Sequence, residues 1–416
     1  MTNHRRVAIT GLGALTPLGL SMTETWPRLL RGESGLAPIT LFDASDLPVR
    51  FAGELKHFDA TQHLDRKLVR RSSRCTHLAL IAAQEAMRDS GLKIGEIDAT
   101  TMGVNIGTGV GALDRTIDGL MSVADGSTRA NPFGIISALS NMPAAMISTH
   151  FNTQGPLSTT VAACASGLQA IGEAAEVIKR GWAKIMIAGG TDALVLRVSI
   201  IGFAAMGVLA KDNDHPAQAC RPFDRSRDGL VLSEGSAMVI LEDYDHALKR
   251  GAHIYAEILG SASTSDTHSL AEPDPTGQNG AQTIRAAIER SGLQPNEIDY
   301  VHAHGTGTQA NDAAETKAIK LVLKESAYTT PVSSIKGMLG HAMGASGAIG
   351  LAMTAQAINE GVIPPTINYQ TPDPTCDLDY VPNVARTKTI GTALINAFGL
   401  GGQNACVVIR KTLEVS

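Results

Sequence analysis

Cysteines are few in this chain, and none is placed to pair with another. The 416 residues contain five, at positions Cys75, Cys164, Cys220, Cys376 and Cys406. An odd number of widely separated cysteines without a Cys-x-x-Cys pair argues against a zinc or redox motif. This usage fits a reducing cytosol, so we expect a cytoplasmic protein.

Charge of one sign and long hydrophobic runs are scarce as well. The formal net charge is only −5 and no long basic block occurs, which argues against a nucleic-acid partner. No run of about 18 uninterrupted apolar residues exists, so no membrane span is expected. The start, "MTNHRRVAITGLGALTPLG", has only a short apolar run broken by Gly and Pro, unlike a signal peptide.

A glycine cluster near the start lacks what a dinucleotide site needs. "AITGLGALTPLG" begins G-x-G after a predicted strand, but Thr16 takes the place of the third glycine and Pro17 follows it. No acidic residue ends a second strand about 20 residues further on. We therefore expect no nicotinamide or flavin cofactor.

What the chain does contain is an alternation of strand-like and helical segments. Short β-branched runs at 6–10 and 101–107 alternate with helical patterns at 73–90 and 165–180, and the second half continues with helices at 279–291, 311–325 and 344–360. This predicts an α/β fold. The length exceeds what one core supports, and local echoes favour two duplicated halves, 1–255 and 256–416. The segment 263–280, rich in Asp, Pro and Gly, is expected to be a long functional loop.

Cys164 lies where a strand-like run meets a helix in "LSTTVAACASGLQAIGEAAEVIKRG". Apolar residues at helical spacing predict a helix that ends at Gly181, so Cys164 sits at its N-terminal end. There the helix dipole can lower a thiol pKa from about 8.5, and small neighbours leave room for a substrate. On position alone a cysteine such as Cys164 is more often a small buried hydrophobe, and we prefer that interpretation for the other four cysteines.

Two histidines beside glycine-rich turns are candidate partners of Cys164. His304 ends the strand-like "EIDYVHAH", where an α/β sheet commonly opens onto its active site. His341 lies in "SSIKGMLGHAMGASG", with Lys336 five residues before it. Each of the twelve histidines can also be an ordinary hydrogen-bonded residue, so the two positions alone do not settle their role.

The order of four motifs along the chain is the most specific feature. "TTVAACASGLQAIGEA", "VHAHGTGTQANDAAET", "SSIKGMLGHAMGASG" and "NAFGLGGQNA" follow one another, with "RPFDRSRDGLVLSEG" between the first two. Together they resemble the β-ketoacyl-acyl-carrier-protein synthases, most closely the elongating FabF-like branch. The resemblance implies a thiolase fold, in which two duplicated halves with mixed five-stranded sheets form an α-β-α-β-α sandwich.

The resemblance also implies a reaction and its residues. Cys164 would carry an acyl chain as a thioester, and His304 and His341 would bind the carbonyl of malonyl-carrier protein and stabilise the enolate left by decarboxylation. The backbone amides of Cys164 and Leu400 would hold the tetrahedral oxyanion. Substrates would arrive on the phosphopantetheine arm of acyl carrier protein, without a cofactor or metal.

Further residues take roles from the same resemblance. Lys336 would order the site, with Glu315 as its ionic partner and Asp312 as a second acidic support. The expected substrate contacts are Thr306, Thr308 and Phe398 and, in the acyl pocket, Phe203 and Val110. For Thr308 and Asp312 ordinary cap and turn chemistry is an equal alternative.

Carrier-protein docking would use positive charge. The run "HLDRKLVRRSSR" supplies Lys67, Arg70 and Arg71, which Arg129 could join, although such a run is often only a solvated helix face. The family implies a dimer, formed either by two copies or with a chain-length-factor-like subunit.

Two departures from the family pattern leave the pathway open. The usual GFGG gate is GLGG here, with Leu400 in place of the bulky residue, and Gln403 replaces a Thr. A smaller gate fits a polyketide or polyene synthase as well as a fatty-acid enzyme. A degradative thiolase is disfavoured because Cys406 does not match its second cysteine, and a chalcone-synthase-like enzyme because it would carry Asn at position 341. A chain-length factor would lack the nucleophilic Cys.

Overall fold

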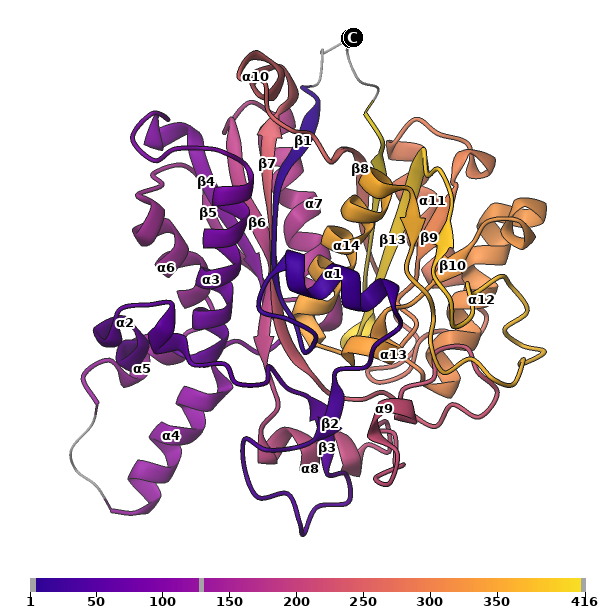
Figure 1. Ribbon diagram of the computed structural model, residues 1–416, viewed down its shortest axis with the longest axis horizontal. Coiled ribbons are helices and arrows are strands. Elements are labelled where there is room, and N and C mark those ends of the chain that lie inside the picture. The colour runs from indigo at the N-terminus through magenta and orange to yellow at the C-terminus, as the bar shows by residue number, and fades with distance from the viewer. Residues whose placement is uncertain (1–4, 127–130, 413–416) are drawn as a thin grey trace.

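One mixed ten-stranded sheet runs through the molecule. The computed structural model describes residues 5–126 and 131–412, and its main sheet has the order β10-β9-β13-β14-β8-β1-β7-β6-β4-β5 (Figure 1). These strands are β1 (Val7–Leu15), β4 (Met102–Gly107), β5 (Leu157–Thr160), β6 (Ile185–Ala193), β7 (Glu234–Asp243), β8 (Ala256–Ser265), β9 (Tyr300–His302), β10 (Val332–Ser333), β13 (Thr392–Gly399) and β14 (Gln403–Arg410). Two short pairs lie apart, β2 (Leu36–Pro38) with β3 (Phe51–Gly53) and β11 (Val362–Ile363) with β12 (Arg386–Thr387).

The sheet consists of the same five-stranded unit twice. From the centre of the sheet outward, the first unit has the strand order β1-β7-β6-β4-β5 and the second has β8-β14-β13-β9-β10. When the strands of each unit are numbered along the chain, both orders read first, fifth, fourth, second, third. In each unit the three inner strands are antiparallel and the outer ones are joined in parallel. The units meet through three residue pairs between β1 and β8. The expected duplication into mixed five-stranded sets is therefore confirmed.

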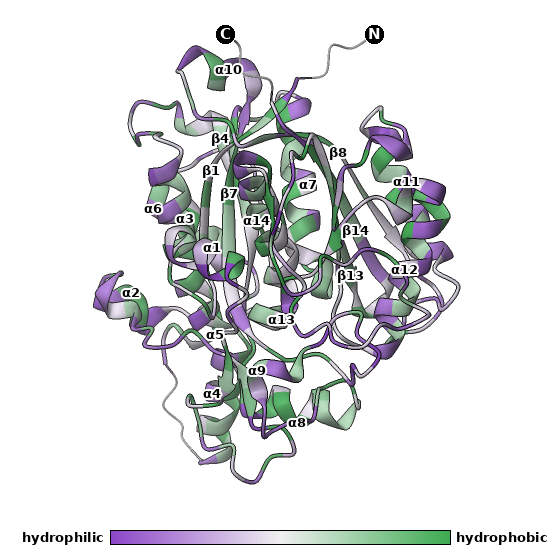
Figure 2. Cartoon of the chain, turned by 45° about the vertical axis from the view of Figure 1, so that its right-hand side comes forward, coloured by the Kyte–Doolittle hydropathy of each residue, from purple (hydrophilic) through white to green (hydrophobic). Residues whose placement is uncertain are grey.

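Helices cover both faces of each unit. The α-helices are α1 (Met22–Leu30), α2 (Arg66–Arg71), α3 (Arg74–Asp89), α4 (Leu113–Ala124), α5 (Gly134–Ala138), α6 (Met142–Phe151), α7 (Ser166–Lys179), α8 (Arg197–Ala205), α9 (Pro216–Ala219), α10 (Tyr244–Lys249), α11 (Gln278–Arg290), α12 (Gln309–Leu323), α13 (Lys336–Leu339) and α14 (Ser346–Glu360). Figure 1 shows α7 and α14 between the two units, α3 and α6 outside the first, and α11 and α12 outside the second. This is the expected α-β-α-β-α sandwich. Among the outer helices, α11 carries both hydrophilic and hydrophobic residues along its length (Figure 2).

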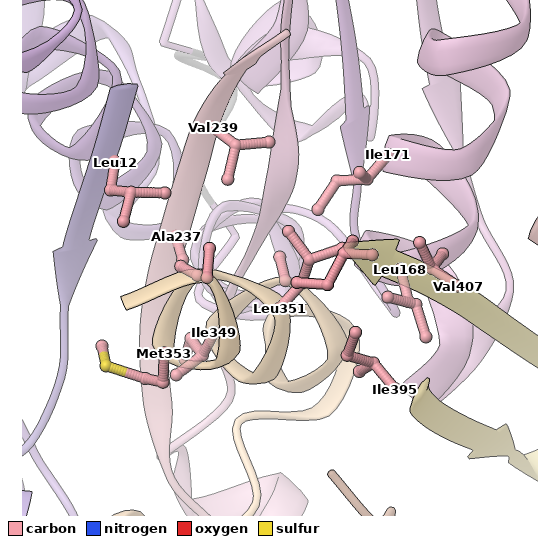
Figure 3. Close-up of a cluster of buried hydrophobic side chains, with 14 of the residues drawn as sticks. Leu12, Leu168, Ile171, Ala237, Val239, Ile349, Leu351, Met353, Ile395 and Val407 are labelled. Carbon is pink, nitrogen blue, oxygen red and sulfur yellow. The ribbon is translucent and has the colours of Figure 1, made fainter. Parts of the chain in front are cut away.

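The largest hydrophobic cluster surrounds the two central helices. Leu168 and Ile171 of α7 and Ile349 and Leu351 of α14 are 3% exposed or less. Figure 3 shows them packed between strands of both units. Because each central helix is buried against its partner as well as against strands, the two units share one core, which fixes their loops relative to each other.

A tight turn precedes each central helix and repeats in detail. The 3₁₀ turns Ala163–Ala165 and Met343–Ala345 lead into α7 and α14, 180 residues apart, and Ala163 and Met343 share the unusual φ of 46°. The helices cross closely here, since a Cβ added at Gly167 would lie 2.6 Å from the carbonyl oxygen of Gly344. The two turns are thereby held face to face.

The predicted helices begin and end within about two residues of the observed ones, but the first strand is longer than expected. It continues through the glycine cluster to Leu15. A Cβ at Gly11 would lie 2.2 Å from the carbonyl oxygen of Ala86, and one at Gly13 would lie 2.1 Å from that of Ala82. These glycines allow α3 to pack closely on β1. Within the described residues, every helix falls short of the length and apolar content needed to cross a membrane.

Candidate active site

Cys164 lies in the first of the repeated turns, at the start of α7. Its side chain is 4% exposed and lines a cavity of about 280 Å³. Cys164 lies at a helix start, as predicted, but its pKa is not lowered as expected. Burial raises the pKa of the thiol to about 11, which outweighs the opposing effects of the Leu400 backbone amide and the Lys336 charge. In the unliganded site Cys164 is therefore a neutral thiol at pH 7.

The two histidines meet Cys164 from the other unit. His304 follows β9 at its carboxyl end, and His341 lies between α13 and the second turn. One donor atom from each of Cys164, His304 and His341 lies within 4.8 Å of the others, and the imidazole centroids are 5.3 Å apart. Burial, aided by the Lys336 charge, holds both histidine pKa values well below 6.5. Both rings are therefore neutral, and each has one N–H to donate.

These three residues are also the one set in the described part of the chain whose donor atoms could share a metal ion. Neutral imidazoles and a cysteine thiolate are typical zinc ligands. The neighbouring ammonium of Lys336, which acts electrostatically on all three side chains, disfavours a cation at this place.

Lys336 and Glu315 hold His304 from two sides and do not bind each other. The buried ammonium of Lys336 donates to the carbonyl oxygen of His304. The carboxylate of Glu315 accepts from the backbone amides of His304 and Gly305, both at 2.7 Å, and from Asn396 at 3.0 Å. Within the described residues no salt bridge within 4.0 Å joins Lys336 to Glu315, but the Glu315 charge acts to raise the pKa of Lys336, so the expected ionic partnership is an electrostatic one without direct contact. The two residues act together through the His304 backbone.

Asp312 organises the turn that follows His304. Its carboxylate accepts from the backbone amides of Phe223 (2.8 Å), Thr306 (3.0 Å) and Gly307 (3.2 Å), and it lies 3.8 Å from the guanidinium of Arg227. Asp312 is therefore a structural support of the turn and is paired with an arginine.

Thr306 and Thr308 line the cavity. Their hydroxyls are 2.9 Å apart, and Thr308 also caps α12 by accepting from the backbone amide of Asn311 at 3.3 Å. Thr308 therefore both caps α12 and lines the cavity.

The acyl-pocket residues are only partly brought together. Phe203 of α8, Phe398 of β13 and Leu400 line the same cavity as Cys164. Val110 does not line this cavity and is 45% exposed, so a single chain does not bring it into the pocket. Phe398 also lies beside His304, with ring centroids 6.0 Å apart.

The segment between β8 and α11, residues 266–277, forms a wall of the cavity and binds the loop that carries Leu400. The backbone amide of Asp266 donates to the carbonyl oxygen of Gly402 at 2.6 Å, and that of Gly401 donates to Leu270 at 2.8 Å. A Cβ at Gly402 would lie 1.8 Å from the Asp266 carbonyl oxygen. The expected long loop is therefore part of the site, and its joint with the Leu400 loop requires glycine.

Asp192 is a site residue that sequence reasoning missed. Its buried carboxylate accepts from the Thr108 hydroxyl (2.8 Å) and from the backbone amides of Gly109 (2.8 Å) and Gly344 (2.6 Å). It thus joins loops of both units behind Cys164, and burial raises its pKa to about 6. An acidic residue at the end of the strand-like "AKIMIAGGTDA" was the available signal.

The expected docking residues lie on a short surface helix. Lys67, Arg70 and Arg71 of α2 are exposed, and the Arg71 guanidinium lies 4.4 Å from the Phe133 ring centroid. Arg129 lies outside the described residues. Three cations therefore remain as the candidate patch.

Comparisons with known proteins agree on one family. The models "Beta-ketoacyl synthase, N-terminal domain" and "Beta-ketoacyl synthase, C-terminal domain" match residues 4–247 and 255–370. The chain is 46% identical to "3-oxoacyl-[acyl-carrier-protein] synthase 2" of Synechocystis sp., over 98% of each chain, and 42% identical to the protein of that name from Coxiella burnetii, over 99% of each.

Solved structures give the same result. One similar structure is a type II polyketide synthase acyl-carrier protein in complex with its ketosynthase bound to the hexaketide, with TM-score 0.91 and 34% identity over 99% of this chain and 100% of that one. Another is the ishigamide ketosynthase/chain length factor, with TM-score 0.91 and 31% identity over the same shares. With its duplicated fold and its cysteine and two histidines at one cavity, this chain belongs to the beta-ketoacyl synthase family.

Proposed function

We propose that this protein catalyses decarboxylative Claisen condensation between an acyl chain on Cys164 and malonyl-acyl-carrier protein. The observation that carries the proposal is the meeting of Cys164, His304 and His341 within 4.8 Å beside a cavity. The product is a β-ketoacyl-acyl-carrier protein, for fatty-acid or polyketide synthesis, as the names of the relatives support.

In the first step the acyl group moves to the enzyme. The sulfur of Cys164 attacks the thioester of the acyl-carrier protein, and its proton ends on the phosphopantetheine thiol that leaves. The backbone amides of Cys164 and Leu400 both act on this sulfur, which supports their role as donors to the oxyanion of the tetrahedral intermediate. Because the resting thiol is protonated, it becomes a nucleophile only as that proton is lost.

In the second step the histidines act as neutral donors. Each N–H donates to the carbonyl oxygen of the malonyl thioester. When the carboxylate leaves as carbon dioxide, its bonding electrons form an enolate whose oxygen both N–H groups stabilise. The enolate carbon attacks the acyl-Cys164 thioester, and the sulfur leaves. Preorganised donors in a buried site stabilise such an oxyanion by about 3 kcal/mol each.

The positions of Lys336 and Glu315 support a positioning role. Between them they bind the carbonyl oxygen and the amide nitrogen of His304, which fixes the backbone that carries the ring. Lys336 also disfavours protonation of both rings. We assign them to holding two uncharged donors in place.

Substrates are proposed to arrive on the phosphopantetheine arm of acyl carrier protein, without a further cofactor. Thr306 and Thr308 place two hydroxyls at the cavity that this arm would enter, and α2 offers exposed cations for an acidic partner. A similar structure is a ketosynthase in complex with its acyl-carrier protein.

A second subunit is proposed to cover the outer edge of the first unit. Strand β5 is the last strand of the sheet, and apolar residues of β5, of the loops after β4 and β5 and of α4 and α5 are exposed. These include Val110, Leu120, Met121, Val123, Ile135, Leu157 and Val161, each at least 45% exposed, and Figure 2 shows hydrophobic residues along α4 and α5. Such a patch indicates an interface. It can be covered by a second copy or by a chain-length-factor-like subunit, and native mass spectrometry distinguishes the two.

Three further assignments complete the proposal. The change from one strand repeat to the next supports a boundary at residue 255 between the half that carries Cys164 and the half that carries the histidines. Five buried cysteines without disulfides support a cytoplasmic location. The smaller gate residue Leu400 favours an unusual acyl chain as the alternative to ordinary fatty-acid elongation.

Incubation with an acyl-carrier protein, followed by intact mass measurement, tests the proposal. The expected result is an acyl adduct that Cys164→Ala abolishes. His304→Ala and His341→Ala should keep the adduct but lose release of carbon dioxide from malonyl-carrier protein. An adduct on the Cys164→Ala protein, or equal loss of both steps in the histidine variants, would contradict the assignment.

A further inference from the structure

His341 can perform its proposed role in only one of its two neutral forms. A neutral imidazole carries one proton, on Nδ1 or on Nε2, and the partner of one nitrogen decides which form is present. The Nδ1 atom of His341 is 2.8 Å from the hydroxyl oxygen of Ser346. Nε2 is therefore the nitrogen left to face the cavity shared with Cys164, and it must carry the proton to donate to a substrate oxygen.

Ser346 is the first residue of α14 and has a counterpart in the first unit. Ser166, 180 residues earlier, opens α7 at the same point of the repeated turn. The hydroxyl of Ser166 binds backbone, since it accepts from the amide of Ala162 at 2.8 Å and donates to the carbonyl oxygen of Ala163. The hydroxyl of Ser346 has no such backbone bond among the described residues and binds His341 instead.

A small second cavity lies behind this pair. It has about 10 Å³ of space for the centre of a water molecule, which is room for one, and Ser233, His302, Lys336 and Ser346 are among its lining residues. Ser233 is fully buried, and its hydroxyl has no hydrogen-bond partner in the described part of the chain. Most of the lining is apolar, but the unpaired Ser233 hydroxyl and the polar side chains of Lys336 and Ser346 are part of it, so the cavity can hold one buried water.

Lys336 would determine how this water is oriented. An ammonium has three protons and no acceptor, and the only acceptor found for Lys336 among the described residues is the carbonyl oxygen of His304. A water that accepts from Lys336 has its own protons free to donate to hydroxyl oxygens. When it donates to Ser346, the proton of Ser346 points to Nδ1 of His341.

We propose that Ser346 is a positioning residue which, with one buried water held by Lys336 and Ser233, keeps the proton of His341 on Nε2. The chain of donors runs from Lys336 through the water and Ser346 to Nδ1. This inference rests on the proposed function for its purpose, because an Nε2 proton matters only if His341 donates to a substrate. The arrangement of hydrogen bonds itself does not depend on that function.

Nitrogen-15 NMR of the histidine rings tests the proton position in the full-length protein without substrate. With the His341 signal assigned by comparison with His341→Ala, the wild-type ring should be the Nε2–H tautomer. Ser346→Ala should populate the Nδ1–H tautomer, and Ser346→Thr, which retains the hydroxyl, should restore the wild-type form. A wild-type ring protonated on Nδ1, or an unchanged tautomer in Ser346→Ala, would overturn the inference.

Activity measurements separate positioning from a purely structural effect. Ser346→Ala should slow carbon dioxide release from malonyl-carrier protein by about 3- to 10-fold, as the loss of one hydrogen bond would, and leave acylation of Cys164 unchanged. Equal slowing of both steps would indicate a structural role and refute the proposal. An Nε2–H ring in a wild-type protein that releases no carbon dioxide would refute the proposed function and leave this inference standing.

A high-resolution crystal structure tests the water separately. Density for one water within hydrogen-bond distance of Ser346 Oγ and Lys336 Nζ is expected. An empty second cavity would remove the water from the proposal.

Discussion

The raised pKa of Cys164 predicts how fast this thiol reacts with an alkylating agent as the pH changes. With a pKa of about 11 against the ordinary 9.0, the thiolate is about one part in 10,000 at pH 7, roughly 100-fold less than for an ordinary thiol. A thiolate of higher pKa is intrinsically more nucleophilic, which raises the rate constant of the thiolate about 10-fold. Cys164 should therefore react about 10-fold more slowly at pH 7 than the cysteine of a short peptide with the same sequence.

The assay is iodoacetamide labelling followed by peptide mass spectrometry between pH 6 and 10. The rate at Cys164 should rise about tenfold per pH unit up to pH 10, because only the thiolate reacts. Cys220 provides an internal control, since burial raises its pKa to about 12 and it does not line the cavity. It should remain unlabelled as long as the protein is folded.

Lys336→Met provides the matched perturbation. The Lys336 charge lowers the Cys164 pKa, so its removal should slow labelling further at every pH, with folding checked by circular dichroism. A rate that is flat between pH 6 and 8 would refute the reasoning. It would show that the helix start and Lys336 together outweigh burial and that the resting group is a thiolate.

Three further predictions follow from the same contacts. Gly167→Ala places a Cβ 2.6 Å from the Gly344 carbonyl oxygen and should lower the free energy of unfolding by about 1 to 3 kcal/mol. Gly119→Ala in α4, where a Cβ meets nothing within 4 Å, should raise it by about 0.5 to 1 kcal/mol. Thermal unfolding that ranks the two variants in the opposite order would contradict the close helix crossing. Leu400→Phe should narrow the range of acyl chains found on the enzyme by intact mass, and an unchanged profile would remove its gate role. Because burial keeps the pKa values of His304 and His341 well below 6.5, decarboxylation should show no histidine titration between pH 6 and 8. A rate that falls as the pH drops through 6.5 would show that a ring becomes protonated there.

Local periodicity made the helices predictable. The spacing of apolar residues from Leu168 to Ile178, followed by Gly181, places α7 to within about a residue, and Gly181 has the positive φ of 75° that such a stop requires. The repeated order of strands was predictable only as a resemblance between halves. Which strands pair depends on contacts far apart in the sequence.

The residue types of the site were predictable from the sequence, but most of the hydrogen bonds between them were not. The motifs around Cys164, His304 and His341 anticipated a set of residues that the fold brings together, but they did not show that Glu315 binds backbone amides instead of Lys336. The effect of burial on Cys164 was also hidden, because a helix start is visible in sequence and the depth of the surrounding core is not. Ser346 gave no signal of its own, since its partner is defined by the geometry of the turn.

The paired turns at the starts of α7 and α14 explain why a duplicated chain has a single reaction centre. Position 164 of the first turn corresponds to position 344 of the second, where the residue is glycine. A Cβ there would lie 2.3 Å from the backbone nitrogen of Gly109 and 2.7 Å from Asp192, so any side chain would collide with the loop behind Cys164. The second turn therefore has no room for a cysteine at the position equivalent to Cys164, and replacing Gly344 alone cannot create a second centre there.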